Sequence, residues 1–155
     1  MPLIIDGHNL IPKIPGLSLD QVDDEVQLIQ LLQEFSRLSR VGVECYFDKA
    51  PQGYDRPRRY GMVAVKFSRL GRSADDEIRS RLMRLGGDAR NYTVVSSDFQ
   101  LQAAARAAKA RVMTADSFAQ KLQQTLRKKP ETKGTPEKEL SPEEIEEWLK
   151  IFRSE

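Results

Sequence analysis

Short apolar runs alternate along residues 1–127 with segments in which apolar residues recur at helical spacing. A run bounded by turn residues predicts a buried strand, and helical spacing predicts an amphipathic helix. The predicted strands are 3–6, 43–47, 62–67, 92–95 and 111–114. The predicted helices are 20–40, 73–85, 98–108 and 117–127. Because strands alternate with helices, we expect a three-layer α/β/α domain with a mostly parallel central sheet.

Turn-forming residues separate these elements. Gly7 permits a tight turn after the first strand, and residues 12–16 are predicted to be a loop. The stretch 50–61 holds two prolines, two glycines and three arginines and is also predicted to be a loop. Ser73, with Asp76 three residues later, has the pattern of a capping box at a helix start.

The composition changes after residue 127, which divides the chain into a domain (1–127) and a tail. Residues 128–140 are polar and contain two prolines and a glycine, so we predict a flexible linker. Residues 141–155 start with Ser-Pro-Glu-Glu, a strong helix start, and carry an apolar stripe: Ile145, Trp148, Leu149 and Phe152. Because so short a helix is marginal alone, we expect the stripe to dock on the domain, on a second copy in a homodimer, or on another protein.

The residue types exclude several kinds of site. The chain has one cysteine, Cys45, and one histidine, His8, so an internal disulfide and metal sites built from several Cys or His are excluded. Cys45 lies in an apolar run and is expected to be a buried thiol. No apolar run approaches the roughly 18 residues of a membrane span, and no signal peptide is recognisable. We therefore expect a cytoplasmic protein that does not cross a membrane.

Charge is unevenly distributed. The net charge is +2, but residues 137–155 carry seven acidic and three basic residues, which leaves +6 on residues 1–136. The stretch 56–72 contains six basic residues and no acid: Arg56, Arg58, Arg59, Lys66, Arg69 and Arg72. Such a stretch favours a polyanionic partner, although a solvated arginine-rich loop has the same composition.

Aspartates stand where strands end and where one helix begins: Asp6, Asp48, Asp75, Asp76, Asp98 and Asp116. The carboxyl ends of parallel strands lie at one edge of a sheet, so we expect these acids to share one cleft. Clustered carboxylates repel one another, which favours a bound cation, and oxygen ligands suit Mg²⁺ or Mn²⁺. Taken singly, each acid also suits a helix cap or the positive end of a helix dipole.

Other reactive side chains are less distinctive. His8 could contact a phosphate or a leaving group, or it could only fill the turn after the first strand. Ser96 and Ser97 could orient Asp98 or bind a phosphate. The sequence has no Ser-His-Asp arrangement and no glycine-rich nucleotide-binding loop, so a serine nucleophile and a nucleotide cofactor are not expected.

Six motifs together resemble one family. They are Asp6-Gly7-His8-Asn9, Tyr46-Phe47-Asp48, Phe67-Ser68-Arg69 before Gly71, Ser73-Ala74-Asp75-Asp76-Glu77-Ile78, Val94-Val95-Ser96-Ser97-Asp98 and Thr114-Ala115-Asp116-Ser117-Phe118. In order and spacing they resemble the NYN domains, specifically the YacP-like branch of the PIN-like ribonucleases. The resemblance covers about residues 1–126, outside the linker and the tail. It implies a PIN-like fold and divalent-metal-dependent cleavage of RNA.

The resemblance also implies roles for single residues. Its catalytic acids are Asp6, Asp75, Asp76 and Asp98. The predicted metal ligands are Asp6, Asp98 and one of the two neighbours Asp75 and Asp76, of which Asp76 is the one chosen. The auxiliary residues are Asn9, Asp116, Ser97 and His8, the last standing where tyrosine is common in the family.

The sequence therefore predicts a ribonuclease, most simply an endonuclease, that uses one or two Mg²⁺ or Mn²⁺ ions to hydrolyse RNA. The predicted RNA-binding residues are Arg56, Arg58, Arg59, Tyr60, Arg69 and Arg72, with Tyr54 and Tyr60 stacking on single-stranded bases. The main alternative is a non-catalytic module that binds RNA or a ribonucleoprotein and recruits a partner through the tail. A third alternative is an adaptor with no nucleic-acid role.

Overall fold

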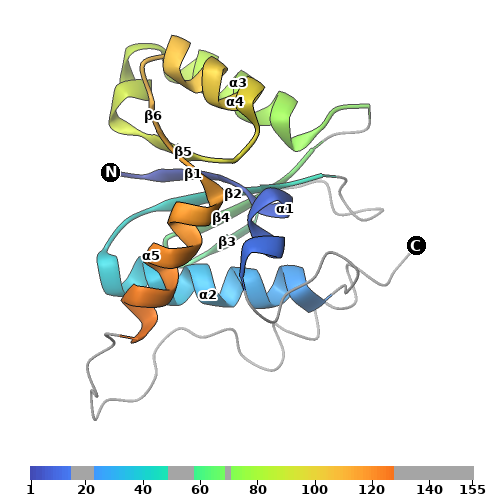
Figure 1. Cartoon of the computed structure of the whole chain (residues 1–155). Helices are drawn as coiled ribbons and strands as arrows, with labels where there is room; N and C mark the ends of the chain where they lie inside the picture. The colour runs from blue at the N-terminus through green and yellow to red at the C-terminus, as the bar shows by residue number, and fades with distance from the viewer. Residues whose placement is uncertain (15–22, 49–57, 69–70, 128–155) are drawn as a thin grey trace.

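The computed structural model of the chain describes residues 1–14, 23–48, 58–68 and 71–127 (Figure 1). The elements are β1 (Leu3–Asp6), α1 (Gly7–Leu10), η1 (Ile11–Lys13), α2 (Asp23–Ser39), β2 (Val43–Phe47), β3 (Arg58–Tyr60), β4 (Val63–Phe67), α3 (Ala74–Leu85), η2 (Gly86–Asn91), β5 (Thr93–Val95), α4 (Phe99–Ala107), β6 (Arg111–Met113) and α5 (Ala115–Arg127), where η marks a 3₁₀ helix. The predicted linker and tail helix lie outside the described residues.

The strands form one six-stranded sheet in the order β3-β4-β2-β1-β5-β6. All neighbouring pairs are parallel except β3 with β4. The chain runs from β1 to β2 and β4 on one side, whereas β5 and β6 lie on the other side of β1. The strand order therefore reverses at β1, the place where ligands bind in open α/β sheets.

Strand β3 corrects the prediction that residues 50–61 form a loop throughout. Arg58 pairs with Val65 and Tyr60 with Val63 in the antiparallel register. Gly61, with a φ of +61°, permits the tight reversal between the two strands. The prolines and arginines of this stretch predict a loop, but charged side chains are also typical of a strand at the edge of a sheet.

Two helix starts also differ from the predictions. The chain turns from β1 directly into the short helix α1 and then into η1, where the sequence indicated a tight turn and a loop. Helix α5 begins at Ala115, two residues earlier than predicted, because the backbone N–H of Phe118 already bonds to the carbonyl of Thr114. Asp116 therefore lies in the first turn of a helix and not at a free strand end.

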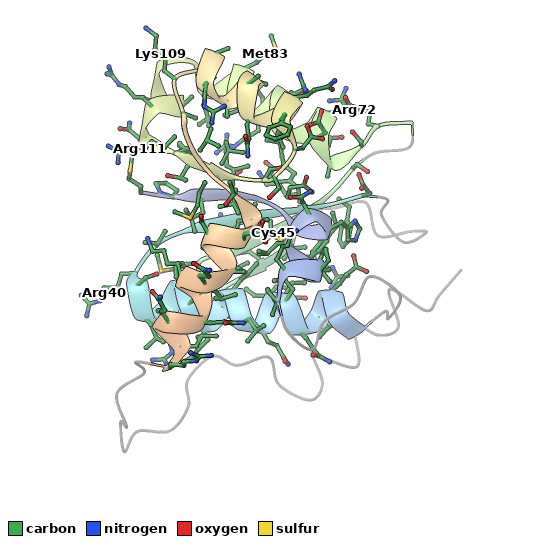
Figure 2. All side chains as sticks on the ribbon, viewed as in Figure 1. Arg40, Cys45, Arg72, Met83, Lys109 and Arg111 are labelled. Carbon is green, nitrogen blue, oxygen red and sulfur yellow. The ribbon has the colours of Figure 1, made fainter. Side chains whose placement is uncertain are left out.

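Side chains of successive strand residues bury on opposite faces of the sheet. Ile5 packs with the core under α2 and α5, where the rings of Phe35 and Phe118 meet edge to face at 5.2 Å. Ile4 packs with the core under α3 and α4. Figure 1 shows the sheet between these two helix layers, which confirms the predicted three-layer fold. Cys45 is fully buried within the sheet (Figure 2), as predicted.

Candidate active site at the carboxyl edge of the sheet

Asp6 ends the central strand β1 at the point where the strand order reverses. Although Asp6 immediately precedes α1, its carboxylate makes no hydrogen bond that caps this helix. The turn after Asp6 leaves no room for a side chain at position 7, because a Cβ atom there would lie 2.4 Å from Cε1 of Phe47. Gly7 meets this requirement. The turn at Gly7 therefore places the Asp6 carboxylate at the edge of the sheet, where the backbone N–H of Asn9 is the group of α1 that interacts with it.

Burial is the main cause that raises the pKa of Asp6 to about 6, and the negative charges of Asp48 and Asp75 raise it further. The positive charge of His8 offsets this effect only in part. Asp48 and Asp75 thus both act electrostatically on Asp6, and the three acids are called here the acidic cluster. A bound cation would relieve both the burial and the repulsion of the charged form.

The neighbouring acids Asp75 and Asp76 face different surroundings. Oδ2 of Asp75 accepts a hydrogen bond of 2.6 Å from Nε of Arg79, whereas its Oδ1 is buried and has no hydrogen-bond partner among the described residues. Asp76 is fully exposed, and its Oδ2 accepts a 3.0 Å bond from the backbone N–H of Ser73. That bond lowers the pKa of Asp76 and closes the predicted capping box. The buried Oδ1 atom, which has no partner in the described part of the chain, therefore singles out Asp75.

Asp48 joins the end of β2 to the start of α3. Its Oδ1 accepts a 2.6 Å hydrogen bond from the backbone N–H of Ala74, the first residue of α3. This bond holds the first turn of α3, with Asp75, at the carboxyl edge beside Asp6. Asp48 was predicted only as one of several strand-end acids, yet its charge is the one that acts most strongly on Asp6.

His8 connects the acidic cluster to helix α2. Its Nε2 donates to Oε2 of Glu25 at 2.7 Å, and its Nδ1 lies 3.6 Å from Oδ2 of Asp48. Burial lowers the pKa of His8, but the hydrogen bond and charge of Glu25, together with Asp48, outweigh burial and raise the pKa above its ordinary 6.5. Glu25 carries no signal in the sequence, because no local pattern links a polar residue of α2 to a turn 17 positions earlier.

Asn9 joins the carboxyl ends of the neighbouring strands β1 and β5. Its Oδ1 accepts a 2.7 Å hydrogen bond from the backbone N–H of Ser97, which follows β5. Next along the chain, Asp98 is exposed and caps α4, its Oδ1 accepting from two backbone N–H groups of the first turn. The backbone N–H of Asp98 donates to Oγ of Ser96 at 3.1 Å. Asp98 thus has the structural role of a cap, at the edge that also holds Asp6.

The remaining auxiliary residues serve the start of α5. Oγ of Ser97 accepts a 3.1 Å hydrogen bond from the backbone N–H of Ala115. Asp116 is exposed, and its Oδ1 lies 3.5 Å from Nζ of Lys13. Exposure and this surface ion pair give Asp116 no visible part in the acidic cluster.

The predicted RNA-binding residues differ in how exposed their side chains are and in whether these already bind other residues. Arg72 is bound to α3, since its guanidinium donates to Oε2 of Glu77 at 3.1 Å and to Oγ of Ser80 at 2.7 Å. Tyr60 is half-buried and packs against the core under α2. Arg59 is exposed on the edge strand β3. The other residues of this set are Arg58, also on β3, and Arg56 and Arg69, which with Tyr54 lie outside the described residues.

The acidic cluster fits a divalent cation in the type of its donors. All three side chains offer hard oxygen atoms, and one buried oxygen of Asp75 has no hydrogen-bond partner among the residues that the structure describes. Within the described ranges, however, no three His, Cys, Asp or Glu side chains are grouped closely enough to hold a metal ion by themselves. The fit therefore concerns charge and donor chemistry, and water would have to complete the coordination.

We predict that Asp6→Asn stabilises the metal-free protein at neutral pH. Between pH 3.8 and about 6 the folded protein binds more protons at Asp6 than the unfolded chain, so the free energy of unfolding falls as the pH rises through this window. In EDTA at pH 7.5 the variant should gain about 2 kcal/mol, and near pH 3.5 the gain should vanish. Urea unfolding at both pH values measures this gain in the free energy of unfolding. A variant less stable than wild type at pH 7.5 would contradict the burial and repulsion at Asp6.

Comparisons with known proteins agree with this fold. The family described as the YacP-like NYN domain matches residues 3–153, beyond the region of about 1–126 that carries the sequence resemblance. The crystal structure of Rae1 (YacP) from Bacillus subtilis is 23% identical, with a TM-score of 0.69, and the alignment covers 82% of this chain and 76% of that chain. The structure of its W164L mutant is 24% identical, with a TM-score of 0.67 and coverage of 82% and 78%. No curated protein matches the chain. No described helix is long and apolar enough to cross a membrane.

Proposed function

We propose that this chain, which belongs to the family of YacP-like NYN domains and has their PIN-like nuclease fold, is a divalent-metal-dependent endoribonuclease. The fold supports a ribonuclease in general, and the acidic cluster at the reversal of strand order supports hydrolysis at that edge. The observation that carries the proposal is the buried Oδ1 of Asp75, which has no partner within the described ranges, together with Asp6, whose pKa is raised to about 6 in part by the charge of Asp75.

In this proposal Asp6 and Asp75 hold Mg²⁺ or Mn²⁺, in part through water, and Asp48 and Asp98 flank them at the ends of the neighbouring strands. We choose Asp75 over Asp76 as the ligand because Asp76 is exposed and its carboxylate serves the capping box. A divalent ion bound there would polarise a phosphoryl oxygen and activate water for attack on phosphorus.

The other polar residues of the edge position these acids. Arg79 holds Oδ2 of Asp75 by a 2.6 Å hydrogen bond and thereby directs Oδ1 away from itself. The hydrogen bond from His8 to Glu25 anchors the turn that carries Asp6. The bond between Asn9 and Ser97 fixes the distance between the ends of β1 and β5. Exposed arginines such as Arg59 would bind phosphates, a contact that weakens as salt rises.

The test is incubation of the purified chain with a labelled single-stranded RNA in Mn²⁺, in Mg²⁺ and in EDTA, with Asp6→Asn in parallel. We expect cleavage that needs the metal and is lost in the variant. Because Asp6→Asn is predicted to be the more stable protein, lost cleavage would not reflect unfolding. Cleavage that needs no metal and that disappears when the protein is purified further would come from a contaminating nuclease. That result would contradict the proposal.

The alternative function is a module that binds RNA or a ribonucleoprotein without cleaving it. It is favoured by one observation, namely that Asp48, Asp76 and Asp98 all accept backbone hydrogen bonds at helix starts. Equal binding of RNA by wild type and Asp6→Asn in EDTA, with no cleavage in either metal, would support it.

A further inference from the structure

Phe99 exposes a large apolar side chain at the candidate active site. It is the first residue of α4, and 84% of its surface is accessible to solvent. The helix buries its other face through Leu101, Gln102 and Ala105, so the core does not use the Phe99 ring. An exposed phenylalanine ring is free to bind a flat apolar surface of another molecule.

The backbone around Phe99 is held in place from both sides. On one side, the N–H of Asp98 bonds to Oγ of Ser96, and the Asp98 carboxylate accepts from the first turn of α4. On the other side, Nε2 of Gln102 donates to the carbonyl of Ser96 at 2.7 Å. A ring on so fixed a helix start loses little backbone freedom when it binds a ligand.

Its position distinguishes Phe99 from the other exposed apolar residues. Helices α3 and α4 cover the same face of the sheet, and both begin at the carboxyl edge; Asp75 lies in the first turn of α3, and Phe99 is the first residue of α4. Met83 is equally exposed, at 83%, but it follows Asp75 by eight residues, about 12 Å along the helix. Figure 2 shows Met83 on the outer side of the helix layer, away from Arg72 at the start of α3.

We propose that Phe99 is a stacking platform for one unpaired base of single-stranded RNA, next to the bond that is cleaved. This inference rests on the proposed function and names its substrate class. Asp98, the residue before Phe99, is exposed and its negative charge disfavours a phosphate at this helix start, so we assign the neutral face of a base to the Phe99 ring. In a duplex both faces of each base are already stacked, which restricts the contact to unpaired RNA.

The experiment compares Phe99→Ala, Phe99→Tyr and the control Met83→Ala with wild type. Binding is measured in EDTA by fluorescence anisotropy of a labelled 12-nucleotide single strand and of a perfectly paired duplex of that length. Phe99→Ala should bind the single strand about ten-fold more weakly and the duplex as wild type does. Phe99→Tyr, which keeps an aromatic ring, and Met83→Ala should match wild type on both probes.

Cleavage in Mn²⁺ separates this inference from the proposed function. Phe99→Ala should raise KM about ten-fold and leave kcat within two-fold. If wild type cleaves nothing but the binding pattern holds, the base contact stands and the proposed hydrolysis fails. Wild-type affinity of Phe99→Ala for the single strand, equal weakening on the duplex, or failure of Phe99→Tyr to restore binding would each overturn the inference.

Discussion

Asp75→Asn should abolish RNA cleavage, with a loss of about a thousand-fold in kcat/KM, whereas Asp76→Asn should keep nearly all activity. The two residues are adjacent, but only Asp75 has a buried oxygen without a partner in the described structure and a charge that acts on Asp6. A thousand-fold loss corresponds to about 4 kcal/mol of transition-state stabilisation, within the range for removing a metal's ligand. The rates are measured under single-turnover conditions in Mn²⁺.

Asp76→Asn is the matched control for this comparison. It removes the same charge one residue away, and it should slightly weaken the capping box with Ser73 without touching the acidic cluster. Calorimetric titration of Mn²⁺ adds a second readout, because Asp75→Asn should weaken metal binding and Asp76→Asn should not. Lost cleavage in Asp76→Asn with normal cleavage in Asp75→Asn would reverse the choice between the two acids.

The role of an acid can be predicted from the sequence when that role depends on local structure. It is harder to predict when the role depends on tertiary contacts. The capping box of Ser73 and Asp76 is encoded within four residues, and the structure confirms it. The particular environment of Asp75 arises only when α3 docks beside β1. The sequence therefore predicts that acids gather at one edge but does not separate Asp75 from its neighbour.

Two other features escaped prediction for related reasons. The partner of His8, Glu25, lies on a different element, and only the packing of α2 below the sheet brings the two side chains to 2.7 Å. Strand β3 is three residues long, and its Arg-Arg-Tyr sequence lacks the apolar alternation that marks a strand. Its ladder with β4 holds it in place, and Tyr60 is the side chain of β3 that packs against the core.

The exposure of Phe99 is not predictable from the sequence, because exposure depends on how the helix packs in the fold. An apolar residue at the start of a predicted helix is expected to face the core, and the pattern of α4 does not show that its first residue lies outside the buried face. Tyr60, chosen as a stacking residue for its arginine neighbours, is in contrast half-buried.

Gly7→Ala should strongly destabilise the protein, with a loss of about 3 kcal/mol in the free energy of unfolding. The new Cβ would lie 2.4 Å and 2.7 Å from two ring atoms of Phe47 and 3.0 Å from the carbonyl oxygen of Tyr46. The Phe47 ring is fully buried and packs against His8 at 5.1 Å and Phe67 at 6.0 Å, so it cannot move aside without disturbing the core. Urea unfolding in EDTA measures the loss, which corresponds to a fall in Tm of roughly 6–12 °C.

Gly87→Ala is the control, because nothing lies within 4 Å of a Cβ at that exposed position, and the free energy of unfolding should change by less than about 0.5 kcal/mol. At a temperature where Gly7→Ala is still folded, its cleavage should also fall, since relief of the clash moves α1 and with it the turn that carries Asp6 and His8. Gly7→Ala as stable as Gly87→Ala would show that the chain after β1 yields easily. In that case the close approach to Phe47 could not be what fixes Asp6 at the edge of the sheet.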